Sequence, residues 1–137
     1  MTLLSTSASY QVTDDNETKS SNSAATAEVA ATFSTRVANA DVTVVVTENG
    51  GNYEIDGVAN AEITANVGDS IHFDLSDASL SGHPLAIYTD STKTTTVTVG
   101  VETSDDGETL LFTPPIAGTF SYQCTQHDNM GGDIVIS

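Results

Sequence analysis

From Asp41 to the end, the sequence consists of short strand-forming runs separated by turn-forming residues. Residues 42–47 are all β-branched, and the Asn49-Gly50-Gly51 that follows is a strong hairpin signal. Over 70–75 apolar and polar residues alternate, which is the period of a strand with one buried face. The other predicted strands are 52–56, 62–67, 85–88, 94–101, 109–113, 119–124 and 133–136. So many short strands predict an all-β protein, specifically a β-sandwich.

One stretch near the C-terminus combines a predicted strand with metal-binding side chains. The strand ends at Cys124, the single cysteine of the chain, and a polar segment then carries His127 and Met130 before two glycines. A thiolate, an imidazole and a thioether form a soft ligand set, which favours copper over magnesium or calcium. We call residues 124–130 the ligand loop. A second histidine would complete a trigonal set, and His83 in the polar segment 76–84 is well placed to supply it.

The Cys-x2-His-x2-Met spacing of the ligand loop resembles the short loop of amicyanin-type cupredoxins, the blue-copper family. The resemblance runs from about Asp41 to the C-terminus. It implies a Greek-key β-sandwich of cupredoxin type and a type 1 copper site. By this resemblance, His83, Cys124 and His127 are the equatorial ligands and Met130 is the axial one. We expect the four side chains to converge at one end of the sandwich.

Pro84, directly after the first expected ligand, departs from the family pattern. Many cupredoxins have asparagine here, and its backbone N–H donates a hydrogen bond to the cysteine sulfur. Proline has no N–H to donate. We therefore expect one hydrogen bond fewer at the sulfur.

Three other interpretations of the ligand loop are weaker. Cys124 could be a buried structural cysteine beside an exposed histidine, since free cysteines are often buried and inert. Zinc fits less well because structural zinc sites use four Cys or His ligands and only three are offered here. A catalytic Cys–His pair lacks an evident orienting group in the sequence. No enzymatic activity is therefore predicted.

The charge of the chain limits its partners. Nineteen acidic and three basic residues give a net charge of −16, and nucleic acids and anionic membranes would be repelled. Within 41–137 there are fifteen acidic residues and one basic residue, Lys93. Salt screens such self-repulsion, so a saline habitat would fit. No apolar run approaches a membrane span, and no signal peptide is visible at the N-terminus.

Residues 1–40 differ from the rest of the chain. They are rich in Ser, Thr, Ala and Asn, and this composition predicts a disordered or extended arm, with one or two helical turns at 24–31. Such a segment is ordered only by contacts from elsewhere. Val12, Val29, Phe33 and Val37 are its few anchoring side chains. We expect two parts, the arm 1–40 and the sandwich 41–137, with the arm binding other protein chains of an assembly.

Two functions compete at this level. The phrases GHPLAIY and YQCTQHDNMGG also resemble cupredoxin-like modules in particle proteins of tailed viruses. This resemblance implies a non-catalytic structural or decoration module on a virion surface. The alternative is a mobile blue-copper electron carrier that works with a redox partner protein outside the cytoplasm. Of the two, the sequence favours the particle module.

Overall fold

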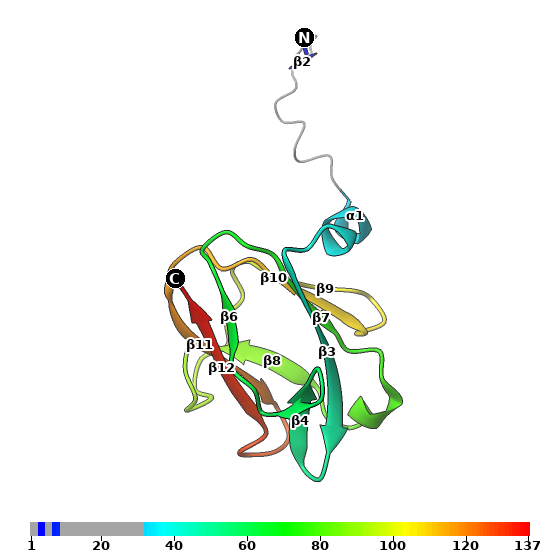
Figure 1. Ribbon diagram of the computed structural model, residues 1–137, viewed down its shortest axis with the longest axis vertical. Coiled ribbons are helices and arrows are strands. Elements are labelled where there is room, and N and C mark those ends of the chain that lie inside the picture. The colour runs from blue at the N-terminus through cyan, green and yellow to red at the C-terminus, as the bar shows by residue number, and fades with distance from the viewer. Residues whose placement is uncertain (1–2, 5–6, 9–31) are drawn as a thin grey trace. The chain divides into compact units, whose positions relative to one another are not determined.

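The computed structural model describes residues 3–4, 7–8 and 32–137 of the chain (Figure 1). Backbone contacts divide the chain into two units, Met1–Asn39 and Ala40–Ser137. In the first unit, β1 (Leu3–Leu4) and β2 (Ser7–Ala8) form an antiparallel pair. The predicted helical turns at 24–31, together with Val12 and Val29, lie outside the described residues. The partner-binding role of the arm stays a prediction.

A short helix, α1 (Phe33–Ala38), lies where the composition predicts a disordered or extended segment. Thr32 caps its first turn, because the Thr32 hydroxyl accepts a hydrogen bond of 3.2 Å from the Thr35 N–H. The Arg36 guanidinium lies 5.8 Å from the centroid of the Phe33 ring. This part of the prediction is wrong because composition averaged over forty residues conceals a local capping signal.

The second unit is a sandwich of two β-sheets (Figure 1), as the strand pattern predicts. One sheet has the order β5-β4-β3-β7-β10-β9 and the other has the order β6-β12-β11-β8. The strands of the first sheet are β3 (Val42–Asn49), β4 (Asn52–Ile55), β5 (Val58–Ala59), β7 (Ile71–Asp74), β9 (Val101–Thr103) and β10 (Thr109–Phe112). Those of the second are β6 (Ile63–Ala65), β8 (Leu85–Tyr88), β11 (Gly118–Cys124) and β12 (Gly131–Ile136). The pairs β3–β7 and β6–β12 are parallel, and the others are antiparallel.

The hairpin signal after β3 is confirmed. Gly50 and Gly51 have φ values of 63° and 87°, and a two-residue hairpin of the favoured type needs positive φ at both positions. A second turn of this kind, with Asp56 at φ 49° and Gly57 at 89°, joins β4 to β5. The short strand β5 was not predicted, because its two exposed residues carry no periodic pattern.

The predicted strand at 94–101 is wrong over most of its length. Only Val101 lies in a strand, and Thr96 forms a single bridge with Tyr88 at the edge of β8. The chain turns at Gly100, whose φ is 79° and where an added Cβ would lie 2.3 Å from the Thr113 carbonyl oxygen. The segment with alternating Thr and Val therefore lies beside β8 and is joined to it by a few hydrogen bonds, such as the 2.8 Å bond from the Val97 N–H to the Ile87 carbonyl.

Aromatic side chains join the two sheets across the core. The Tyr122 ring of β11 lies 6.3 Å, centroid to centroid, from the rings of Tyr53 and of Phe73 in the opposite sheet. Phe112 and Phe120 meet edge to face at 5.5 Å. Tyr122 is fully buried, and its hydroxyl donates a 2.6 Å hydrogen bond to the Ala61 carbonyl, so it is a core side chain with its polar group satisfied.

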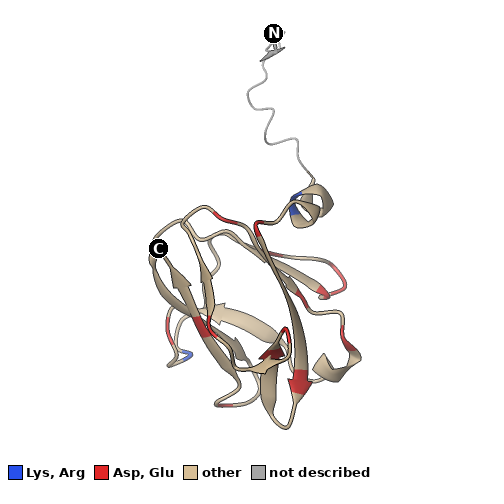
Figure 2. Cartoon of the chain, viewed as in Figure 1, with Lys and Arg blue, Asp and Glu red and all other residues tan. Residues whose placement is uncertain are grey.

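Acidic residues are spread over many strands and loops of the sandwich and are not gathered in one patch (Figure 2). Several of them order the turns that they occupy. Asp74, Asp77 and Asp90 each accept hydrogen bonds from the Ser or Thr two residues later, which lowers the pKa of each carboxyl group. None of the described helices has the length and apolar character needed to cross a bilayer. The saline habitat stays a prediction.

The β11–β12 pair offers a matched test of crowding. Gly118 and Gly131 have similar φ values, 146° and 150°, but an added Cβ meets nothing within 4 Å at Gly118 and would be 1.9 Å from the Tyr122 carbonyl oxygen at Gly131. Gly118→Ala should lower the free energy of unfolding by about 1–3 kcal/mol, through backbone strain alone. Gly131→Ala should cost about 1–3 kcal/mol more in the free energy of unfolding. Urea unfolding measures both, and equal losses would contradict this account.

Candidate metal centre

The register of β11 against β8 brings the predicted ligands together. Cys124, the last residue of β11, lies opposite Leu85, the first residue of β8. His83 comes two residues before Leu85, so it leaves the sheet beside the cysteine. The Thr125 N–H donates a 2.9 Å hydrogen bond to the Pro84 carbonyl, which ties the ligand loop to the segment that carries His83.

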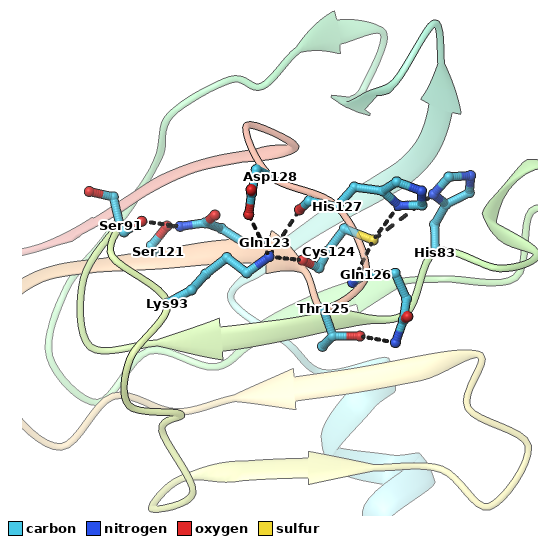
Figure 3. A network of polar contacts seen from close by, with 10 residues as sticks. All are labelled: His83, Ser91, Lys93, Ser121, Gln123, Cys124, Thr125, Gln126, His127 and Asp128. Carbon is cyan, nitrogen blue, oxygen red and sulfur yellow. Dashed lines mark hydrogen bonds and ion pairs between the residues drawn. The ribbon is translucent and has the colours of Figure 1, made fainter.

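Both histidines turn their Nδ1 atoms toward the cysteine sulfur (Figure 3). The Cys124 Sγ atom lies 3.9 Å from His83 Nδ1 and 3.4 Å from His127 Nδ1. The two imidazole rings are 4.8 Å apart, centroid to centroid. One donor atom from each of the three residues lies within 4.8 Å of the other two.

These separations fit a shared metal ion. Metal–nitrogen and metal–thiolate bonds of about 2.0 and 2.3 Å, with about 120° between them, separate the two donors by about 3.7 Å. The two observed sulfur–nitrogen distances, 3.9 and 3.4 Å, lie on either side of that value. One thiolate and two imidazoles in this arrangement are the equatorial donors of a blue-copper site. The residues present therefore fit a type 1 copper ion.

Met130 closes the ligand loop at its other end. The Cys124 N–H donates a 2.9 Å hydrogen bond to the Met130 carbonyl, and the Met130 side chain is fully buried among the core residues. Its role as the axial ligand stays a prediction.

Tyr53 supports His83 from the opposite sheet, a contact that the sequence did not indicate. Its hydroxyl donates a 2.8 Å hydrogen bond to the His83 carbonyl. Burial raises the pKa of Tyr53 well above its ordinary value, and the neighbouring Cys124 raises it further. The hydroxyl therefore stays a neutral donor. A tyrosine in a strand carries no sequence signal that distinguishes this role from core packing.

Backbone groups of the ligand loop also reach the sulfur. The Gln126 N–H donates to Cys124 Sγ at 3.4 Å. Pro84, beside the first histidine, offers no N–H for a second such bond. Lys93 also contacts the ligand loop, because its ammonium group donates hydrogen bonds to two backbone carbonyls of that loop. The sequence alone assigns no role to this lysine.

Some solved structures of other proteins resemble this chain weakly. No protein-family model matches the sequence, and no curated protein matches it. Among solved structures, a rusticyanin described as a copper protein has a TM-score of 0.47 and 19% identity, covering 70% of this chain and 77% of that one. Rusticyanin from Thiobacillus ferrooxidans has a TM-score of 0.45 and 17% sequence identity, and the match covers 70% of this chain and 77% of that one. A reduced amicyanin variant has a TM-score of 0.40 and 22% sequence identity, and the match covers 74% of this chain and 89% of that one.

Rusticyanin and amicyanin are cupredoxins, and the resemblance seen in the ligand loop is to the same family. All three TM-scores lie below 0.5. The structure itself shows a two-sheet β-sandwich in which His83, Cys124 and His127 form a candidate copper site. A virion role and an assembly partner stay predictions, as does a location on a virion surface or outside the cell.

We expect the missing N–H at Pro84 to lower the reduction potential of the copper-loaded protein. A hydrogen bond to the ligating sulfur withdraws charge and favours the reduced metal. Pro84→Asn and Pro84→Ala both restore an N–H, so both should raise the potential by tens of millivolts, where about 59 mV is a tenfold change for one electron. Voltammetry measures this shift. An unchanged or lower potential in both variants would contradict the argument.

Proposed function

We propose that this protein binds one copper ion at His83, Cys124 and His127 and transfers single electrons through it. The observation that carries the proposal is the convergence of one thiolate and two Nδ1 atoms, with sulfur–nitrogen distances of 3.9 and 3.4 Å. Copper bound there would supply a one-electron couple. The proposed role is not enzymatic, because the thiolate serves as a metal ligand and not as a nucleophile.

The chain contributes a rigid setting for this chemistry. Hydrogen bonds close the ligand loop on itself through Met130 and fasten it to Pro84 in the His83 segment. Tyr53 holds the backbone of His83 from the other sheet. A site fixed from several elements keeps its donors in place whatever the charge of the metal, and so little rearrangement accompanies electron transfer.

The three donor residues differ in how much of each is exposed to solvent. Cys124 is fully buried, His83 is half-buried and His127 is exposed. The sulfur is therefore shielded from reagents in solution, while the His127 ring reaches the surface. We propose that electrons enter and leave through the His127 ring, with a redox partner protein docking over it.

Copper binding can be tested directly on the full chain. Addition of Cu(II) should give one bound ion per chain and the intense visible absorption of a copper–thiolate bond. Cys124→Ser should abolish this absorption, since the hydroxyl is a hard, weak ligand. His127→Ala should weaken or shift it by removing one equatorial donor.

His72 provides a matched control. It is half-buried on β7 and lies outside the donor cluster. His72→Ala should therefore keep the copper absorption of the unchanged protein. A visible band that survives in Cys124→Ser, or a site that takes zinc in preference to copper, would contradict the proposal.

The charge of the protein predicts its electron-exchange kinetics. Because the chain itself carries a net charge of −16, the copper-loaded protein stays strongly negative and should exchange electrons faster with a cationic one-electron reagent than with an anionic one of similar potential. Added salt should slow the first reaction and speed the second, because it screens both interactions. Stopped-flow absorption at the copper band measures the rates. Copper that cannot be reduced and reoxidised reversibly would exclude the electron-transfer role.

A further inference from the structure

We propose that Lys93 is a positioning residue that clamps the ligand loop in its metal-binding shape before a metal arrives. This inference rests on the proposed copper site, but it concerns a residue that donates no metal ligand. Lys93 lies in the connection between β8 and β9, outside both the ligand loop and the segment that carries His83.

The Lys93 ammonium group spans the ligand loop from outside (Figure 3). Its Nζ atom donates a 2.8 Å hydrogen bond to the Cys124 carbonyl and a 3.0 Å hydrogen bond to the His127 carbonyl. These are the backbones of two of the three clustered donor residues. One cation thus fixes the distance between the cysteine and the exposed histidine, and charge-assisted hydrogen bonds are stronger than neutral ones.

The lysine is itself held in place by the structure around it. The Asp90 carboxylate accepts a 2.9 Å hydrogen bond from the Thr92 N–H, which orders the turn that leads into Lys93. The buried Gln123 of β11 donates a 3.0 Å hydrogen bond to the Ser91 carbonyl. The connection is therefore attached to the same strand that ends in the copper-ligating cysteine.

The backbone and burial of Lys93 also mark it as a constrained residue. Its φ is 60°, an uncommon value for a residue other than glycine. Its side chain is 18% exposed, although lysine side chains usually lie in solvent. The nearby carboxylate of Asp128, 3.6 Å from Nζ, is 93% exposed, so that ion pair is largely screened. The two carbonyl bonds are therefore the stronger polar contacts of the lysine side chain.

Lys93→Met tests the proposal because it keeps most of the side-chain length and removes the charge and the donors. In the metal-free full chain, loss of the clamp should let the ligand loop open, so Cys124 should react faster with a thiol reagent. In the copper-loaded chain, copper affinity should fall about 10–100-fold, and the visible spectrum should shift.

Asp128→Asn is the matched control. Although Asp128 belongs to the ligand loop, this change removes only the exposed ion pair and leaves both carbonyl hydrogen bonds, so its effects on thiol reactivity and copper affinity should be much smaller than those of Lys93→Met. Tyr122→Phe, which loses a core hydrogen bond away from the ligand loop, separates general destabilisation from the specific effect. It should lower stability without shifting the copper spectrum.

The outcomes separate the two proposals. If the unchanged chain forms the copper–thiolate band and Lys93→Met matches it in affinity, spectrum and thiol reactivity, the clamp is wrong and the copper site stands. If the unchanged chain binds no copper, the proposed function is wrong. The thiol reactivity of metal-free Lys93→Met then decides whether the lysine holds the loop, and no increase would overturn the clamp.

Discussion

The hydrogen bond from the Cys124 N–H to the Met130 carbonyl is the constraint on which the site depends. It joins the end of β11 to the residue before β12, so the ligand loop projects His127 back over the cysteine without leaving the sheet. Gly131 makes this close return feasible, because any side chain there would collide with the Tyr122 carbonyl. The geometry of the site is thus set by the pairing of two central strands of the smaller sheet.

The strands and the donors of the ligand loop were predictable because both depend on local sequence. The alternation of apolar and polar residues over 70–75 predicts a strand with one buried face, and Ile71 and Phe73 are fully buried in the structure. The spacing within the ligand loop depends on seven consecutive residues. The segment 94–101 was misassigned for the same reason: alternating Thr and Val are compatible with a strand, and only the turn at Gly100 and the lack of a neighbouring ladder decide against it.

The supporting contacts were not predictable because they join residues far apart in the chain. Tyr53 reaches the His83 carbonyl over 30 residues, and Lys93 reaches the Cys124 carbonyl over 31. A tyrosine on a strand and a lysine in a loop have no sequence pattern that distinguishes these roles from ordinary packing or solvation. The convergence of His83 with the ligand loop was expected from its place in a second polar segment and from a family resemblance, and the β8–β11 register supplies its physical reason.

The charge pattern of the sandwich gives the lysine a particular significance. Residues 41–137 carry fifteen acidic side chains and only this one basic side chain. Several of the acidic side chains at this surface, such as Asp74, Asp77 and Asp90, accept hydrogen bonds within their own turns. A cation on such a surface would ordinarily bind the nearest carboxylates. Lys93 is instead mostly buried and donates to two neutral carbonyls of the ligand loop, while the carboxylate beside it stays in solvent. The single basic side chain of the unit thus lies where two backbone carbonyls of the metal site converge.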